Sequence, residues 1–347
     1  MRRKFFQALA AAVGVAVAFG IPPVSYAETP GNPGTQIKAP SPPGQLFDLG
    51  GYKLHLNCTG HGKPTVVLSA GAGDFSTDWA LVQPKVASFA RVCSYDRSGA
   101  AWSGLGPKPR TMYQEAFDLQ RLLTAAGEQG PYVMVGHSLG GMVVRIFGEE
   151  HPKDVVGMVL VDAYSEDAQL NMAGKLQRMR LLAKGRPVPA VRERATSADQ
   201  LSDVEIQKIN DFIHQMGAPK IEAPFDKLPV DAQQDRLWAL SLPQNFAEDD
   251  DYMAEISAEM YKQDQLQKYP LGAIPLVVLT RSQYDYPGPA DDAATLIREH
   301  KEQQAKMAQL SSNGIQVVVP NSGHHIQLDA PEQVVAAIKQ VAAHISH

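Results

Sequence analysis

The chain has 347 residues, of which 44% are hydrophobic and 20% are charged, with 28 Gly, 25 Pro and only 2 Cys. This composition excludes collagen-like, low-complexity, cysteine-stapled and polytopic membrane proteins, because each of those classes needs a compositional extreme. The formal net charge of -5 argues against a nucleic-acid partner, since such proteins concentrate Lys and Arg on a surface that displaces counterions.

The first 27 residues have the pattern of a cleaved signal peptide. Basic residues at 2–4 precede an apolar run at 8–21, and small side chains surround Ala27. The run is too short and too rich in Ala and Gly to anchor the chain stably in a bilayer. The Arg pair also resembles a twin-arginine signal, so both the Sec and the Tat route stay open. We therefore expect an exported protein, periplasmic or secreted, whose net charge after cleavage is -5 - 3 = -8.

Residues 28–45 are predicted to form a linker. Five prolines lie there among Gly and Ser, with almost no apolar side chains. Such a segment cannot bury enough surface to offset the entropy cost of ordering it.

Residues 46–347 are predicted to form one folded domain of the α/β class. Runs typical of strands lie at residues 52–58, 65–69, 91–95, 132–135, 155–161, 274–280 and 315–319. Helical spacing of apolar residues is found at 111–126, 141–150, 290–310 and 331–345. This alternation predicts crossover connections and a mostly parallel sheet. Residues 46–50 and 52–58 are instead expected to pair as an antiparallel hairpin.

Residues 165–270 interrupt the alternation. They contain no convincing strand but several amphipathic helices, for instance at 203–216 and 249–267. Because the segment is inserted between two strands and cannot extend the sheet, we expect it to form a helical lid above it. Its Met side chains and Trp238 would line either an adaptable apolar pocket or an ordinary core.

A Gly-His-Ser-Leu-Gly motif at residues 136–140 follows one predicted strand and opens a helix. The order strand, Gly-x-Ser-x-Gly, helix is that of a nucleophile elbow. The sharp turn holds Ser138 in strained backbone angles, so we expect Gly136 and Gly140 to have no room for a β-carbon. At a helix N-terminus, free N–H groups stabilise negative charge on the serine.

A serine nucleophile needs a base, and a side chain that accepts protons near neutral pH is His. His324 lies after the last predicted strand and before the last helix, at the sheet edge where Ser138 must also lie. We assign the base role to His324 and a packing or supporting role to its neighbour His325.

Two aspartates are candidates for the acid that orients His324. Asp285 follows the strand at 274–280 and fits the chain order Ser, Asp, His, so we favour it. Asp162, which ends the strand at 155–161, is the alternative, although a strand-terminal Asp is often only a cap.

An oxyanion hole needs backbone donors. Leu139, directly after the serine, is expected to supply one N–H, and Ala72 in the Ala-Gly-Ala-Gly loop at residues 70–73 the other.

Together these motifs, with Tyr-Asp-Arg-Ser-Gly at 95–99 and Leu-Val-Asp-Ala at 160–163, resemble the α/β-hydrolase superfamily. The resemblance extends from about Gln45 to the C-terminus and is weakest across residues 165–270. It implies an eight-stranded sheet, a Ser-His-acid triad and ester-type hydrolysis without a cofactor. The usual His-Gly pair of the oxyanion loop is Ala-Gly at residues 70–71, which makes the donor role of Ala72 less certain. Asp96 and Arg97 are carried over only as a structural corner.

In that fold the second and fourth strands are neighbours, which would bring Cys58 beside Cys93. An exported protein favours a disulfide between them. His55, Cys58 and His61 imitate the spacing of a metal site, but residues an odd number apart on a strand face opposite sides, so no metal is expected there.

The sequence therefore predicts an exported serine hydrolase acting on a small-molecule acyl ester. A binding or sensing protein on the same scaffold is the alternative from another class. A peptidase, lactonase, acyltransferase or haloperoxidase-like variant is the alternative among enzymes. A dehalogenase or epoxide hydrolase is disfavoured, because the resemblance places Asp in those enzymes where Ser138 stands. Nothing in residues 165–270 names the substrate.

Overall fold

The computed structural model describes residues 39–172, 175–184, 194–198, 200–246, 252–284 and 290–343. The predicted signal peptide at 1–27 and most of the predicted linker at 28–45 lie outside these ranges, so both stay predictions. Within the described part of the chain, no helix combines the length and the apolar character that crossing a membrane requires.

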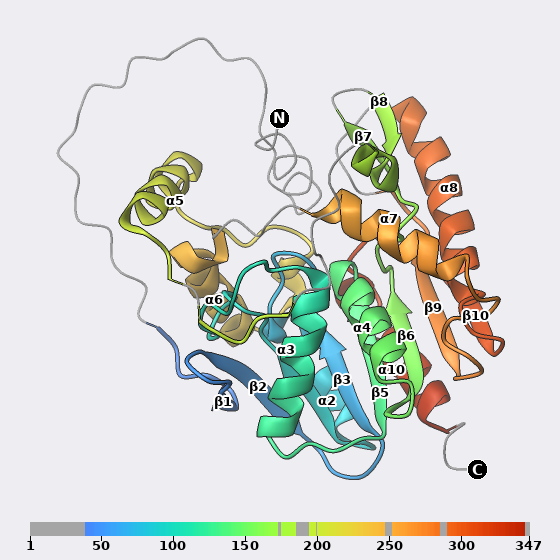
Figure 1. The fold of residues 1–347 in the computed structure, drawn as a ribbon, viewed down its shortest axis with the longest axis horizontal. Coiled ribbons are helices and arrows are strands. Elements are labelled where there is room, and N and C mark those ends of the chain that lie inside the picture. The colour runs from blue at the N-terminus through green and yellow to red at the C-terminus, as the bar shows by residue number, and fades with distance from the viewer. Residues whose placement is uncertain are drawn as a thin grey trace.

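An eight-stranded sheet forms the centre of the fold, in the order β1-β2-β4-β3-β5-β6-β9-β10 (Figure 1). The first two pairings, β1 with β2 and β2 with β4, are antiparallel, and the five others are parallel. The prediction of a mostly parallel eight-stranded sheet with an opening hairpin is thereby confirmed. The strands are β1 (Gln45–Asp48), β2 (Lys53–Thr59), β3 (Thr65–Ser69), β4 (Val92–Tyr95), β5 (Tyr132–His137), β6 (Val155–Val161), β9 (Leu276–Arg281) and β10 (Gly314–Val319).

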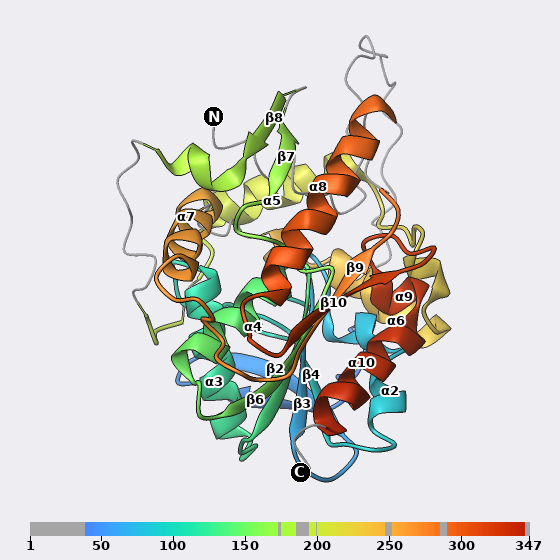
Figure 2. The ribbon, with the colours of Figure 1, turned by 90° about the vertical axis from the view of Figure 1, so that its right-hand side faces the viewer.

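Helices cover both faces of the sheet (Figures 1 and 2). On one face lie α3 (Met112–Ala125), α4 (Leu139–Glu150) and α8 (Ala290–Ala308), and on the other lie α2 (Gln83–Val86) and α10 (Pro331–Ala343). Two short elements, η1 (Ser76–Trp79) and α9 (Ile326–Asp329), follow β3 and β10. This layering explains why the strand sequences are apolar on both faces.

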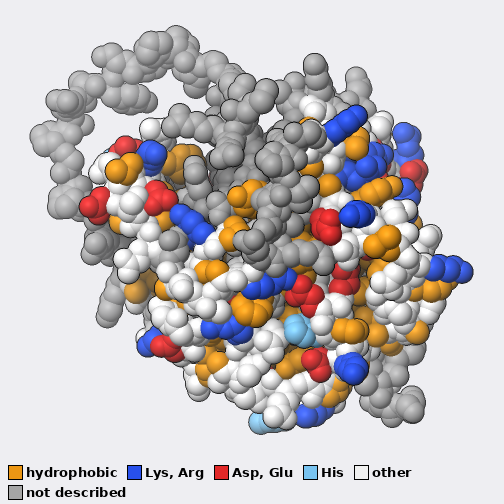
Figure 3. All heavy atoms as spheres, in the orientation of Figure 1, with side chains coloured by type: hydrophobic (Ala, Val, Ile, Leu, Met, Phe, Trp, Pro, Cys, Tyr) orange, Lys and Arg blue, Asp and Glu red, His pale blue; other side chains and the backbone are white. Residues whose placement is uncertain are grey.

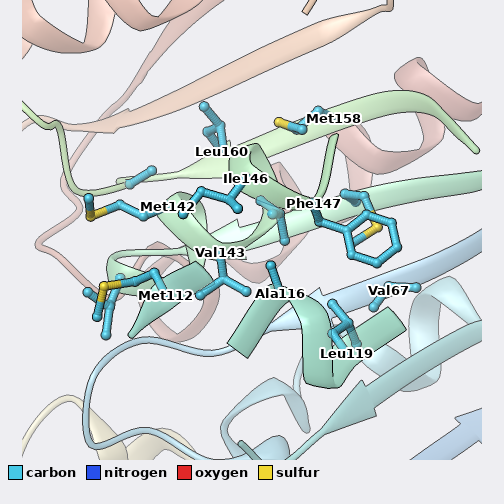
Figure 4. Close-up of a cluster of buried hydrophobic side chains, with 14 of the residues drawn as sticks. Val67, Met112, Ala116, Leu119, Met142, Val143, Ile146, Phe147, Met158 and Leu160 are labelled. Carbon is cyan, nitrogen blue, oxygen red and sulfur yellow. The ribbon is translucent and has the colours of Figure 1, made fainter. Parts of the chain in front are cut away.

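The core is built from alternating strand side chains. Met134 on β5 joins the cluster beneath α3 and α4, whereas Val133 and Val135 join the cluster beneath α2 and α10. Figure 4 shows the first cluster, where Leu119 of α3 and Phe147 of α4 meet side chains of the sheet. Each fully buried side chain of this size contributes about 1.5–3 kcal/mol by leaving water. The sheet edge that carries the polar groups therefore rests on a rigid, apolar base.

A disulfide joins Cys58 to Cys93, as predicted. The two residues are direct partners in the antiparallel pairing of β2 with β4. The bridge closes a loop with a sequence separation of 35 residues.

The described part of residues 165–270 holds eight elements, and the expectation that no strand lies among them is wrong. Near its start, two short strands pair with each other in antiparallel orientation, from Gln169 opposite Arg178 to Met172 opposite Lys175. Such a pair satisfies its own backbone hydrogen bonds without joining the main sheet. In Figures 1 and 2, this pair, α5 and α7 lie beyond one end of the main sheet. The elements are β7 (Gln169–Met172), β8 (Lys175–Arg178), η2 (Met179–Ala183), α5 (Asp203–Met216), η3 (Phe225–Lys227), α6 (Val230–Leu240), η4 (Pro243–Phe246) and α7 (Met253–Asp264).

The surface in Figure 3 carries mixed charge. On this face, the coloured Lys and Arg side chains lie interspersed with Asp and Glu side chains. Opposite charges at short range offset each other's field, so this face presents no extended potential of one sign.

Candidate active site

The strand register brings the predicted site residues to one edge of the sheet. Gly136 of β5 pairs with Ser69 of β3, and His137 pairs with Val161 of β6. In the same way, Val319 of β10 pairs with Arg281 of β9. The strands therefore end side by side at one edge of the sheet. The segments that follow them carry the predicted oxyanion loop, Ser138, Asp162 and His324.

Ser138 lies in a strained turn between β5 and α4. Its backbone φ is 50°, a left-handed value that residues other than Gly rarely adopt. The turn is held by the backbone: the Ser138 carbonyl accepts hydrogen bonds from the N–H groups of Gly141 and Tyr164. The side chain is partly exposed, and its hydroxyl makes no hydrogen bond with any residue in the described ranges.

The two glycines of the motif are required by close backbone packing, as predicted. A β-carbon on Gly136 would lie 2.5 Å from the carbonyl oxygen of Gly140. A β-carbon on Gly140 would lie 2.4 Å from the carbonyl oxygen of Ser69. Both distances are far below van der Waals contact, so any larger residue would distort the turn that holds Ser138.

His324 contacts Asp162. Nδ1 of the imidazole lies 2.7 Å from Oδ2 of the carboxylate, and the Asp162 side chain is fully buried. Because a carboxylate only accepts, Nδ1 must carry the hydrogen of this bond. In the neutral imidazole that tautomer leaves the Nε2 lone pair free to accept a proton.

Three further hydrogen bonds hold Asp162. His300 of α8 donates from Nε2 to Oδ1 over 2.7 Å. Arg281, the last residue of β9, donates from its backbone N–H to Oδ1 and from its guanidinium to Oδ2, over 3.0 Å and 2.8 Å. Burial alone would raise the pKa of the Asp162 carboxyl, but the charges and hydrogen bonds of these partners hold it well below its usual range. Asp162 is thus a fixed carboxylate.

Burial dominates the electrostatics of His324. Removal from water lowers the pKa of His324 to about 3, against the opposing effect of the hydrogen bond to Asp162. The imidazole is therefore neutral over the physiological pH range, which is the state that a general base requires.

The other acid candidate, Asp285, lies outside the described residues. Its assignment stays a prediction, whereas the contact of Asp162 with His324 is observed. Asp162 has a positive φ of 42°, so it departs from the strand at the end of β6.

The loop at residues 70–73 follows β3, where the sequence predicts an oxyanion donor. The Arg97 guanidinium holds the loop by donating hydrogen bonds to the carbonyl oxygens of Ala70 and Gly71. The bond to Gly71 is 2.6 Å long. Ala72 is partly exposed. Leu139, the other predicted donor, is the first residue of α4, where the backbone N–H groups have no partner within the helix.

Comparison with known proteins decides the family. A sequence profile described as the alpha/beta hydrolase family matches residues 66–337. The chain belongs to this family.

Similar proteins agree with this assignment. The chain is 24% identical over 302 residues to an AB hydrolase superfamily protein of Gibberella zeae, covering 80% of this chain and 86% of that protein. Other curated relatives match over shorter stretches, and the chain spans between 22% and 49% of their length.

Two solved structures share the fold. A thermophilic esterase from Thermogutta terrifontis superposes with a TM-score of 0.56 at 22% identity, covering 83% of this chain and 92% of that one. The epoxide hydrolase CorEH superposes with a TM-score of 0.59 at 17% identity, covering 87% and 98%.

Sequence reasoning missed several residues that surround the candidate site. His300 and Arg281 hold Asp162, although they are 138 and 119 residues away in sequence. Asp74 and His137 form a buried pair beside His324. Of these four residues, only His137 had a signal in the sequence, because it lies inside the Gly-x-Ser-x-Gly motif. Arg97, which holds the loop at residues 70–73, was predicted as part of the structural corner.

Two of the three residues that imitate a metal spacing have other partners in the structure. Cys58 is bonded to Cys93. Nδ1 of His55 lies 2.8 Å from Oδ2 of Asp96, and Nε2 donates to the carbonyl oxygen of Pro43 over 2.8 Å. The buried His55–Asp96 pair supports the interpretation of Asp96 as a structural corner.

Proposed function

We propose that this chain is a serine hydrolase that cleaves acyl esters of small molecules through Ser138, His324 and Asp162. The observation that carries the proposal is the 2.7 Å contact between Nδ1 of His324 and buried Asp162, at the sheet edge where Ser138 occupies its strained turn. On this geometry we prefer Asp162 to Asp285 as the acid.

The mechanism follows from the proton positions. Nε2 of His324 takes the proton of the Ser138 hydroxyl as Oγ attacks the acyl carbon, and Asp162 stabilises the resulting imidazolium. The N–H groups of Leu139 and Ala72 would bind the oxyanion. Collapse of the tetrahedral intermediate breaks the ester bond, and His324 returns its proton to the departing alcohol. Water, activated by His324, then attacks the acyl-enzyme and releases the acid and Ser138.

Serine chemistry favours an acyl substrate over an epoxide. Attack of a serine hydroxyl on an epoxide would form an ether, which water does not cleave under these conditions, so the enzyme would stall after one turnover. Attack on an acyl carbon forms an ester, which the same base can hydrolyse. Structural similarity to an epoxide hydrolase therefore carries over the fold and not the reaction.

Residues 165–270 are proposed to act as a lid that shapes the substrate site. Arg236 of α6 lies 3.5 Å from Asp74, next to the oxyanion loop, and Trp238 of the same helix packs on Trp102. A helix so close to the site is in a position to limit the size of the acyl or alcohol group.

We also propose export, with cleavage of the signal peptide after Ala27. The Cys58–Cys93 disulfide supports this, because stable disulfides form in oxidising compartments. N-terminal sequencing of the protein recovered outside the cytoplasm is expected to begin at Glu28. A start at Met1 would contradict it.

Hydrolysis of p-nitrophenyl esters of graded chain length tests the proposed reaction. Ser138→Ala is expected to lower kcat by about 10³-fold or more, because the nucleophile is removed. Ser165→Ala, on the segment after β6, is the matched control and is expected to stay within about threefold of wild type. Full activity of Ser138→Ala, with the fold intact by circular dichroism, would refute the proposal. Folded wild-type protein that hydrolyses none of the esters would favour a binding protein.

A further inference from the structure

His137, the residue before the nucleophile, connects two parts of the site. Its side chain is 1% exposed. Nδ1 lies 3.2 Å from Oδ2 of Asp74, three residues after Gly71 in the oxyanion loop. Nε2 lies 3.0 Å from the backbone carbonyl oxygen of His324.

Both ring nitrogens of His137 face atoms that only accept hydrogen bonds. A backbone carbonyl oxygen has no hydrogen to give, and neither has an ionised carboxylate. Burial by itself would raise the pKa of Asp74, but hydrogen bonds from His137 and His325 and the charge of Arg236 hold it well below its usual range. Nε2 of His137 therefore carries a hydrogen, and Nδ1 carries a second one when the hydrogen of its contact with Asp74 lies on the ring.

The local charge balance agrees with a cationic His137. Two buried carboxylates, Asp74 and Asp78, share the single guanidinium of Arg236 from α6. His325 also faces Asp74, with Nε2 3.7 Å from Oδ2. A buried excess of negative charge is costly, and protons on the imidazoles that face Asp74 offset it. Asp74 raises the pKa of His325 against the effect of burial, and His137 lies closer to the Asp74 carboxylate than His325 does.

The trio Asp74, His137 and His325 has side chains of metal-binding type within 4.8 Å of one another. A metal ion would need a lone pair on His137, yet Nε2 faces the carbonyl oxygen of His324 and Nδ1 faces the Asp74 carboxylate. The nearby guanidinium of Arg236 also repels a cation. The hydrogen-bonded ion pair is therefore the better description of this cluster.

Gly71 makes room for the pair. A β-carbon there would lie 2.7 Å from Oδ2 of Asp74 and 2.8 Å from Nδ1 of His137. This close contact explains why residue 71 of the loop is a glycine.

We propose that His137, held as a buried imidazolium between Asp74 and the carbonyl of His324, is a positioning residue for the base. It ties the oxyanion loop, the nucleophile turn and the base loop together through one side chain. The catalytic part of this inference rests on the proposed function. The charge state of His137 is independent of the proposed function.

The charge has a second consequence, because the rings of His137 and His324 lie 4.6 Å apart. Within the described residues, the charged or titratable groups that also face His324 include Asp162, Arg281 and His325. After burial, which is the largest effect, the positive charge of His137 is one of the factors that lower the pKa of His324. Loss of that charge makes the base easier to protonate.

Nitrogen NMR of the full wild-type chain tests the charge state without any activity. At pH 7, the His137 ring, assigned by its through-space contacts to the His324 ring, is expected to show two protonated nitrogens. A signal from one unprotonated ring nitrogen would overturn the proposal.

The catalytic consequence is tested with His137→Gln, which removes the charge and keeps a donor. We expect kcat for p-nitrophenyl ester hydrolysis to fall about tenfold with KM nearly unchanged. The acidic limb of the kcat/KM profile should move upward by about one pH unit, as expected for loss of a unit charge at this distance.

His55→Gln is the matched control, because His55 is a second fully buried His that bridges a carboxylate and a backbone carbonyl. It is expected to lower Tm as much as His137→Gln does, with no shift of the acidic limb. If both variants lose stability and neither shifts the limb, His137 is merely structural and the proposal fails. If Ser138→Ala is fully active while NMR shows the imidazolium, the proposed function fails and the charge assignment stands.

Discussion

At the scale of single residues, the site depends on how firmly Asp162 is held. Four hydrogen bonds reach its two oxygens, from the Arg281 backbone and guanidinium, from His300 and from His324. A carboxylate fixed in this way fixes the tautomer of His324 in turn. The orientation of the base is therefore set before substrate binds.

Replacing the acid is the sharpest test of this arrangement. Asp162→Asn is expected to lower kcat about 10²–10⁴-fold, because an amide can donate to Nδ1 and stabilise the wrong tautomer. Asp285→Asn is the matched control and is expected to stay within about threefold of wild type. Steady-state hydrolysis of a p-nitrophenyl ester measures both, and the opposite ranking would reinstate Asp285 as the acid.

The pH profile should show the effect of burial on His324. Its pKa is lowered from 6.5 to about 3. His324 therefore stays unprotonated as the pH falls through 6.5, and kcat/KM is expected to stay constant there. The unfolded chain takes up that proton more readily, so His324 destabilises the fold increasingly as the pH drops toward 3. Circular dichroism at each pH separates the two effects. An acidic limb near 6.5 in folded enzyme would contradict the account.

At the scale of elements, the nucleophile turn depends on close approach of α4 to the segment after β6. A β-carbon on Gly141 would lie 2.3 Å from the β-carbon of Ala163, the residue after Asp162. The helix that begins directly after Ser138 is therefore in close contact with the segment that follows β6 and carries Asp162.

Gly141→Ala is expected to destabilise the fold by about 1–3 kcal/mol through overpacking and to lower kcat, because the helix must shift away from Ala163. Gly104→Ala serves as the control, since its β-carbon would meet nothing nearer than 3.5 Å and its φ is not in the left-handed region. Urea unfolding measures both variants. Equal stability of the two would show that α4 accommodates the methyl group.

The sequence allowed the elements of the sheet and the elbow to be predicted because both have local signals. Alternating strand and helix periods indicate the parallel sheet, and Gly136 and Gly140 follow from the sharp turn. The choice between Asp162 and Asp285 had no such signal, since it depends on β6 and β9 being direct neighbours with Val161 beside Leu279. Strands β7 and β8 were missed because four-residue strands in a polar hairpin have too little periodicity to recognise.

At the scale of the whole molecule, a buried ionic group joins residues 165–270 to the central domain. Arg145 of α4 donates to Glu166 and to Asp264 of α7, each over 2.6 Å, and its side chain is fully buried. Burial and the nearby Glu166 raise the pKa of Asp264 to about 7, although the charge of Arg145 opposes this. The two buried carboxyl groups therefore depend on the positive charge of Arg145.

Arg145→Met is expected to cost about 3–5 kcal/mol of stability, because it leaves two carboxyl groups buried without their cation. The control Arg91→Met breaks the Arg91–Glu128 pair, whose Arg side chain is 31% exposed, and should cost no more than about 1 kcal/mol. Thermal unfolding measures both. Similar losses would contradict the account of a buried group that joins the two parts.

The central claim is that Ser138 is an activated nucleophile. Covalent labelling of the folded chain with a fluorophosphonate, followed by peptide mapping, tests it most directly. The account predicts one label per chain, on Ser138, with slower labelling in Asp162→Asn and none in Ser138→Ala. An unlabelled Ser138 in folded wild-type protein, or a label that persists in Ser138→Ala, would contradict it.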